Sequence, residues 1–268
     1  MPHLKQLHAP VRREPVFRAL VLCPFLLALA PACREPAAPP APSAAPPARP
    51  AADVKWGTIE GRVRLTGTPP PPEKRPTTGT VVSVCGEQTE DRSLVVGGEG
   101  ALAYTVVSLK EGASLPAPAH PAPEPVLDQK RCLYDPPVLA ARAGGTLALR
   151  NSDPLVHNVR AASATSRSVF NVAMPLEGMT LKRPLPDAPG TVTIRCDIHP
   201  WMKSVVRTFD HPYFATTGAE GRFRLEVPEG THTLVFWHER LPELARTVNV
   251  RAGEVVQVEQ GWETAALK

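Results

Sequence analysis

The chain contains 33 prolines in 268 residues, and they are clustered rather than evenly spaced. Proline lacks a backbone N–H and disrupts helix interiors, so this content argues against long helices. Proline clusters at 34–52, 69–76 and 116–125 predict a linker and two loops. Elsewhere, short runs of alternating apolar and polar residues indicate β-strands separated by turns. We therefore expect an all-β fold of the sandwich or barrel type.

The first 32 residues have the pattern of a signal peptide. A basic stretch ends at Arg18, an apolar run covers 19–30, and small residues precede Cys33. The run is short for a bilayer span. Cys33 resembles the cysteine of a bacterial lipobox, which is lipidated; the alternative is ordinary cleavage that leaves Cys33 free. We expect an exported protein, either periplasmic or anchored to the outer membrane, with residues 33–53 as a Pro/Ala-rich spacer.

The net charge of +4 is concentrated in this leader. Residues 1–32 carry Lys5, Arg12, Arg13 and Arg18 against Glu14, a net charge of +3, so only +1 belongs to the rest of the chain. No basic stripe remains, and we expect no nucleic acid as partner.

Beyond the spacer, the alternation pattern predicts several short strands. The expected strands cover 58–65, 101–109, 146–150, 191–196, 203–209, 223–227 and 233–237. In the strand 191–196, the side chains of Val192, Ile194 and Cys196 should share one face. The last two strands, joined by Pro-Glu-Gly, are expected to form a hairpin.

The segment Cys196-Asp-Ile-His199-Pro-Trp-Met202 carries the chemistry. It places a thiol, an imidazole and a thioether at three-residue intervals between two expected strands, where a tight loop can direct them to one point. Two histidines, one cysteine and a distant methionine form the blue-copper ligand set. The second imidazole must come from elsewhere, and His157, which follows the expected turn at 151–154, is the candidate.

These residues resemble the cupredoxins. CDIHPWM is similar to the short copper loop of amicyanin-type members, LRNSDPLVHNV to the segment that supplies their first histidine, and the Gly190-led strand to the one that enters the copper cysteine. The resemblance covers roughly 127–208. It implies one type 1 copper held by His157, Cys196, His199 and Met202.

The resemblance also implies roles for the neighbours of these ligands. Asn158 would brace the two loops by hydrogen bonds. An exposed edge of His199, flanked by Pro200 and Trp201, would be the electron port; the alternative for Trp201 is that it caps the core. Asp197 beside the cysteine departs from the usual pattern.

Residues 213–260 resemble a second family, the carboxypeptidase regulatory-like β-sandwich related to transthyretin-type folds. The resemblance rests on TTGAEGRFRL and VPEGTHTL. We therefore predict a cupredoxin Greek-key sandwich at 127–208 and a regulatory-like sandwich at 209–265. The N-terminal β region at 54–126 either stands alone or belongs to the second sandwich, so the two modules are either sequential or interwoven.

The five cysteines divide by role. Cys23 leaves with the signal peptide, Cys33 is the lipidation site, and Cys196 binds copper. Cys85 and Cys132 remain, and in an oxidising compartment such a pair favours a disulfide over two separate thiols.

The favoured function is single-electron transfer with a redox partner protein, and not enzyme activity. Copper oxidases and nitrite reductases connect the type 1 cysteine to other coppers through an adjacent histidine, whereas Cys196 has Arg195 and Asp197 as neighbours. The remaining alternative is a structural or copper-sequestering lipoprotein. His211, His232 and His238 are expected to satisfy local hydrogen bonds rather than bind a second metal.

Overall fold

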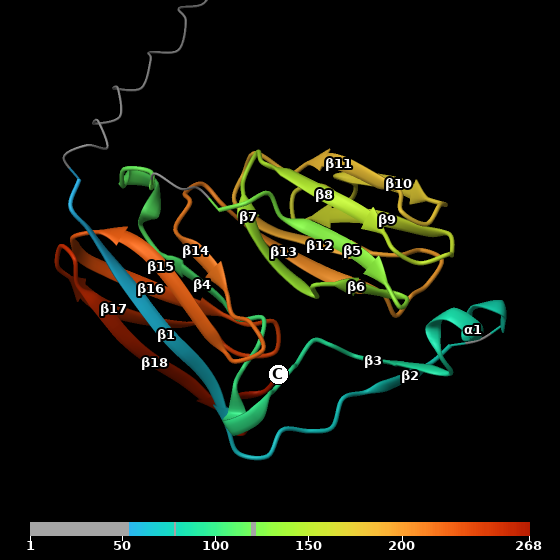
Figure 1. The fold of residues 1–268 in the computed structure, drawn as a ribbon, viewed down its shortest axis with the longest axis horizontal. Helices are drawn as coiled ribbons and strands as arrows, with labels where there is room; N and C mark the ends of the chain where they lie inside the picture. Colours follow the sequence, from blue (N-terminus) through green and yellow to red (C-terminus); the bar gives the residue numbers. More distant parts are fainter. Residues whose placement is uncertain (1–53, 78, 119–121) are drawn as a thin grey trace, which may run out of the picture. The chain divides into compact units, whose positions relative to one another are not determined.

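The computed structural model describes residues 54–77, 79–118 and 122–268 (Figure 1). Nearly all of its regular structure is β-strand, arranged around two separate hydrophobic cores. The expected all-β fold is therefore confirmed. No helix in these described residues is long and apolar enough to span a membrane. The signal peptide, the spacer and Cys33 lie outside the described residues.

The sandwich that carries the candidate site has two sheets. The larger sheet has the order β10 (Phe170–Met174), β9 (His157–Ser163), β12 (Gly190–Arg195), β13 (Lys203–Phe209) and β7 (Val138–Arg142). The smaller has the order β11 (Thr180–Pro184), β8 (Thr146–Asn151), β5 (Val126–Lys130) and β6 (Leu133–Asp135). The pairs β13–β7 and β5–β8 are parallel, and the others are antiparallel. We call this the first sandwich.

Alternation along the strands builds the core of the first sandwich. Leu147 and Leu149 of β8 face the same core as Val192 and Ile194 of β12, and all four are buried. Cys196 continues this inward face one residue beyond the end of β12. The expected one-sided placement of 192, 194 and 196 is confirmed, because residues two apart on a strand point to the same side.

The second sandwich combines strands from both ends of the described chain. One sheet has the order β15 (Arg222–Pro228), β1 (Trp56–Thr66) and β18 (Val255–Glu263). The other has the order β14 (Phe214–Thr216), β4 (Val106–Leu109), β16 (Gly230–Trp237) and β17 (Leu244–Val250). The chain therefore leaves this sandwich after β4, forms the first sandwich and returns at β14, so the strands of the two modules are interwoven in sequence.

The centre of β1 has no room for a side chain at Gly61. A Cβ there would lie 2.2 Å from the backbone oxygen of Val258 and 2.6 Å from the ring of Phe223. Glycine lets β15 and β18 close on β1 from both sides.

The described residues of segment 68–96 contain little regular structure, and we call this segment the arm. It contains the short strands β2 (Lys74–Pro76) and β3 (Gln88–Glu90), the 3-10 turn η2 (Gly79–Val81) and the single-turn helix α1 (Val82–Cys85). Three more 3-10 turns lie at η3 (Gly98–Gly100), η4 (Gly112–Ser114) and η5 (Thr264–Ala266). Cys85, at the end of α1, is disulfide-bonded to Cys132, with the two Cα atoms 5.3 Å apart. The expected disulfide is therefore present.

Two expectations about strands are wrong in detail. The strand expected over 101–109 begins only at Val106, because Tyr104 has a φ of 60° and residues 101 and 102 form only isolated bridges. The expected hairpin at 223–237 does not form, since β15 and β16 lie in different sheets. Each has one apolar face, and burying both places them across the core, where the rings of Phe223 and Phe236 are 5.9 Å apart.

Candidate metal centre

The loop between β12 and β13 is closed by its own backbone. Arg195 and Lys203 are the last pair of the antiparallel ladder. Beyond them, the N–H of Cys196 donates to the carbonyl of Met202 at 3.3 Å, and the N–H of Met202 donates to the carbonyl of His199 at 2.9 Å. The loop is thus short and tightly turned, and Cys196, His199 and Met202 are all buried.

Strand β9 brings His157 beside this loop. It pairs antiparallel with β12, from Ser163 opposite Val192 to Arg160 opposite Arg195, so its first three residues run alongside the loop that follows β12. The Nδ1 atoms of His157 and His199 are 2.8 Å apart, and Nδ1 of His199 lies 3.8 Å from Sγ of Cys196. One donor atom from each of the three residues lies within 4.8 Å of the other two.

Met202 is the remaining member of the expected ligand set. Its side chain is fully buried in the same apolar cluster as Cys196. This burial is compatible with a weak axial ligand, and equally with a residue that packs the core. The role of Met202 as a ligand stays a prediction.

The donor set fits a copper ion. Two imidazole nitrogens and a sulfur converge in a buried place, and the contact between the two nitrogens requires a shared proton when no ion is bound. Thiolate and imidazole together suit copper in both of its oxidation states. His157, Cys196 and His199 would hold the ion, and the surrounding apolar core would keep water away from it.

The three donors influence one another's protonation. Burial raises the pKa of Cys196, but hydrogen bonding from His157 and nearby backbone groups outweighs this, and the net pKa is lowered. Burial lowers the pKa of His157, but the Asp153 carboxylate and the Cys196 sulfur outweigh this and raise it. Burial and the charge of His157 lower the pKa of His199. The surroundings therefore shift the equilibrium of Cys196 toward the thiolate, the form that binds a metal.

Asn158 connects the start of β9 to the cysteine loop. Its Oδ1 accepts the backbone N–H of Asp197 at 2.7 Å and lies 3.4 Å from Sγ of Cys196. Its Nδ2 donates to Oδ2 of Asp197 at 2.9 Å. Asp197 also forms a salt bridge of 2.6 Å with Arg160. Asn158 thus contacts the loop that follows β12, and its bracing role beside a bound metal stays a prediction.

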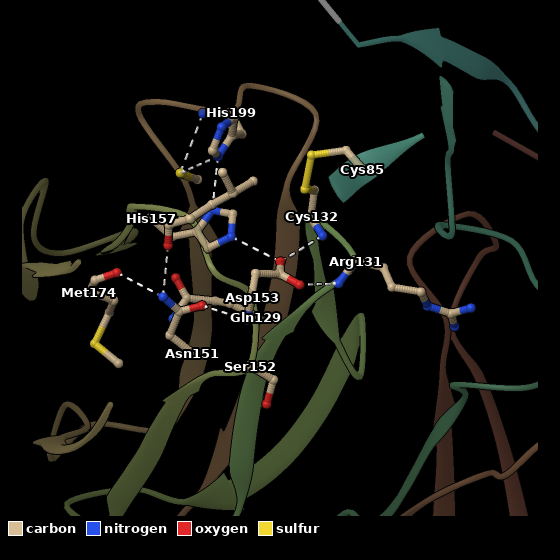
Figure 2. Close-up of polar contacts among 12 residues, drawn as sticks. Cys85, Gln129, Arg131, Cys132, Asn151, Ser152, Asp153, His157, Met174 and His199 are labelled. Carbon is tan, nitrogen blue, oxygen red and sulfur yellow. Dashed lines mark hydrogen bonds and ion pairs between the residues drawn. A yellow bond between two sulfur atoms is a disulfide. The ribbon is translucent and has the colours of Figure 1, made fainter. Parts of the chain in front are cut away.

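Asp153 was not predicted as part of the site. Its Oδ2 lies 3.0 Å from Nε2 of His157, on the ring edge opposite the nitrogen that faces His199 (Figure 2). Both residues are buried. From the sequence, Asp153 was expected only to lie in a turn; its position four residues before the candidate histidine was the available signal.

The expected exposed edge of His199 is not found. Only 4% of the residue is accessible, because Trp201 packs beside its ring at a centroid distance of 5.2 Å. Trp201 is half-buried against the core and donates its Nε1–H to the carbonyl of Cys132 at 3.0 Å. The neighbours Ile198 and Pro200 are exposed instead.

The other described histidines do not join a metal cluster. In the residues that the structure covers, the only groups of possible His, Cys and carboxylate ligands are the three donors above and a set formed by Cys132, Asp153 and His157. Cys132 is already used in the disulfide. His211, His232 and His238 each contact nearby backbone atoms.

The known proteins found to be similar to this chain are all solved structures. No family model matches the chain, and no curated protein does. A Cu(I) amicyanin variant is 21% identical over 38% of this chain and 98% of its own, with a TM-score of 0.28. A purple cupredoxin from Nitrosopumilus maritimus is 21% identical over 32% of this chain and 100% of its own, also with a TM-score of 0.28. A copper-containing nitrite reductase from Thermus scotoductus is 21% identical over 36% of this chain and 25% of its own, with a TM-score of 0.27.

Proposed function

We propose that this protein is an exported type 1 copper protein that transfers single electrons. The observation that carries the proposal is the convergence of His157, Cys196 and His199 on one buried point. A bound copper ion would supply a one-electron couple, since Cu(I) favours sulfur and Cu(II) favours nitrogen. Met202 is the proposed axial ligand.

The ligands come from elements that are fixed by backbone hydrogen bonds, which suits electron transfer. His157 is the first residue of β9, and the loop 196–202 is closed at both ends by β12 and β13. A framework that holds the donors in one place limits the rearrangement that a change of oxidation state would otherwise cause. Asn158 supports the same framework by bridging the two elements.

A redox partner protein is the proposed source or acceptor of the electron. Val156 and Ile198, which precede the two histidine ligands, are each 50% exposed. These uncharged side chains beside the buried centre support docking of a partner here, since the core of a protein interface is poor in charged residues. Because His199 itself is covered, the electron would pass through the thin layer formed by these neighbours and Trp201.

The proposal excludes enzyme activity as the main role. Arg195 and Asp197 flank Cys196, so the chain has no adjacent histidine to lead electrons to another copper. The second sandwich, which resembles a carboxypeptidase regulatory-like module, would serve as structural support. Export, and membrane attachment through a lipid on Cys33, remain part of the proposal on the strength of the N-terminal sequence.

Copper sequestration is the second candidate. The burial of His199 favours it, because a covered ligand slows contact between the metal and a partner. The electron self-exchange rate, measured by NMR line broadening in mixtures of the Cu(I) and Cu(II) protein, separates the two. Rapid exchange supports electron transfer, and exchange too slow to detect supports sequestration.

Visible absorption and electron paramagnetic resonance of the full chain with added Cu(II) test the copper site itself. We expect an intense thiolate-to-copper band that is absent in Cys196→Ser. Met202→Leu is the matched control: it should keep the band and shift the reduction potential, since the proposed thioether is a weak, distant ligand. A folded protein that binds Cu(II) without such a band would contradict the type 1 assignment.

A further inference from the structure

We propose that Asp153 is a positioning residue for His157, and that the Cys85–Cys132 crosslink holds Asp153 in place, so that reductive opening of this bridge weakens the copper centre. The inference rests on the proposed function and extends it. It links the copper site to a disulfide that the ligand set does not include.

Asp153 fixes which nitrogen of His157 can bind a metal. Both of its oxygens accept backbone N–H groups, those of Arg131 and Cys132, so Asp153 acts as a hydrogen-bond acceptor at this place. Nε2 of His157, 3.0 Å from Oδ2, is therefore the ring nitrogen that carries the proton. Nδ1, which faces His199, is then the nitrogen that presents a lone pair to an ion. A carboxylate in this position also orients the ring and increases its basicity.

The turn at Arg131 and Cys132 holds the carboxylate. The N–H of Arg131 donates to Oδ1 of Asp153 at 2.6 Å, and the N–H of Cys132 donates to Oδ2 at 2.8 Å (Figure 2). Both turn residues have positive φ, 53° and 56°, and they join Lys130 to Leu133 at the end of the β5–β6 ladder. Two such residues in a two-residue turn are usually Asn and Gly, since other side chains are disfavoured there. The conformation that aims both N–H groups at Asp153 therefore needs support from outside the turn.

The disulfide supplies that support. It joins the turn to the arm, and the sulfur of Cys132 lies within 4.8 Å of the Asp153 and His157 donor atoms. The carbonyl of Cys132 accepts the indole N–H of Trp201, which packs on His199. One residue thus contacts both halves of the copper site, through Asp153 to His157 and through Trp201 to His199. Loss of the crosslink removes the covalent tie between the turn and the arm, and leaves the turn held by its hydrogen bonds to Asp153 and Trp201.

A dithiol is the reductant that would open the bridge. Cys85 is partly exposed and Cys132 is fully buried, so the attacking thiolate would reach the sulfur of Cys85. The S–S bond breaks, Cys132 leaves as a thiolate and takes a proton, and a mixed disulfide forms on Cys85. The second thiol of the reductant then displaces Cys85, so the dithiol is oxidised by two electrons and the bridge is reduced by two.

The first test compares Asp153→Asn with Asp135→Asn in the full chain. Asp135 is a surface carboxylate on β6 that pairs with Arg92 and does not contact His157. We expect Asp153→Asn to lower copper affinity by about 10–100-fold, the usual effect of removing the partner of a ligating histidine. Its reduction potential should rise, because a less basic imidazole favours Cu(II) less. Asp135→Asn should match the wild type in both.

Two measurements on metal-free protein keep the test independent of copper. The imidazole ¹⁵N shifts of His157 should report a proton on Nε2 in the wild type and a mixture of tautomers in Asp153→Asn. The amide hydrogens of residues 131 and 132 should exchange faster in Cys85→Ser/Cys132→Ser, which keeps both backbone N–H groups but removes the crosslink. If the wild type shows no thiolate-to-copper band, the proposed function fails while these readouts still decide the positioning role.

The double serine variant also tests the bridge in copper-loaded protein. We expect copper affinity and potential to change in the same direction as in Asp153→Asn. Treating the wild type with a dithiol should reproduce the change, and the same treatment of the double variant controls for direct action of the dithiol on copper. The proposal would be overturned by the following result. The wild type shows a normal thiolate-to-copper band, and both Asp153→Asn and the double serine variant equal Asp135→Asn in every readout.

Discussion

The two sandwiches bury histidines in different ways. In the first sandwich, His157 and His199 are buried with their Nδ1 atoms 2.8 Å apart and next to a cysteine. In the second, His211, His232 and His238 are also buried, but each ring contacts a backbone group two to four residues away. Burial alone therefore does not distinguish a ligand from a structural histidine.

The candidate ligand histidines differ from the structural ones because they come from separate elements and converge on one point. The two histidines of the first sandwich come from the start of β9 and from the β12–β13 loop, and their nitrogens face each other rather than a backbone atom. The backbone contacts in the second sandwich already satisfy the rings, as buried polar groups require. A metal would gain little there, because it would have to replace a hydrogen bond at each ring.

The largest effect should come from replacing the two candidate ligand histidines. Replacing the structural histidines of the second sandwich in the same way gives the comparison. We expect His157→Gln and His199→Gln each to abolish the thiolate-to-copper band and to lower copper affinity by more than the roughly 100-fold that marks the upper end for indirect supports. His211→Gln and His232→Gln should retain wild-type copper affinity. Isothermal titration of Cu(II) with parallel absorption spectra measures both. A copper affinity that falls equally in His232→Gln would remove the distinction between the two sandwiches.

The sequence predicted the part of this site that is formed by residues close to one another in the chain. Cys196, His199 and the alternation of β12 follow from local pattern, as does the all-β fold. The contact between Asp153 and the turn at Cys132 could not be found in this way, because the two residues are 21 positions apart and meet only through the parallel pairing of β5 and β8. The hairpin expected at 223–237 failed for a related reason: two amphipathic strands satisfy the same pattern whether they pair or face each other across a core.

The covering of His199 also depends on tertiary contacts. The sequence places Trp201 two residues away, but not its hydrogen bond to Cys132, 69 positions earlier in the chain. That contact holds the indole against the imidazole. An exposed histidine edge was therefore a reasonable expectation from the loop sequence and a wrong one for the folded protein.

Protonation of His238 should make the stability of the second sandwich depend on pH. Burial, with the nearby charge of Arg240, lowers the pKa of His238 to about 4 from 6.5. The folded state thus favours the neutral ring, whose Nδ1 accepts the N–H of Arg240 at 3.2 Å. The unfolded chain takes up the proton first, so stability is lost as the pH falls from about 6.5 to 4. The full loss is about 3 kcal/mol for this one group.

Denaturant unfolding at pH 7 and pH 4 measures this effect. We expect the pH-dependent loss of stability to be about 3 kcal/mol smaller in His238→Gln than in the wild type, because glutamine can still accept the Arg240 N–H and has no proton to gain. Thr247→Ala, an exposed change on β17, should follow the wild type. Equal pH dependence in His238→Gln and wild type would show that the ring is protonated in the folded state as readily as in the unfolded chain.

The smallest expected effect lies at Asn158, where support of the loop can be separated from metal binding. Asn158→Ala removes the acceptor of the Asp197 N–H and the donor to its carboxylate, at a net cost of about 1 kcal/mol in the free energy of unfolding. We expect the thiolate-to-copper band to remain but to shift in wavelength, because Sγ of Cys196 loses its neighbour at 3.4 Å. Asn171→Ala is the matched control, since Asn171 contacts Asn158 and Asp197 but not the sulfur in the described contacts. A band that shifts as much in Asn171→Ala would mean that the carboxylate of Asp197, rather than the amide of Asn158, sets the environment of the cysteine.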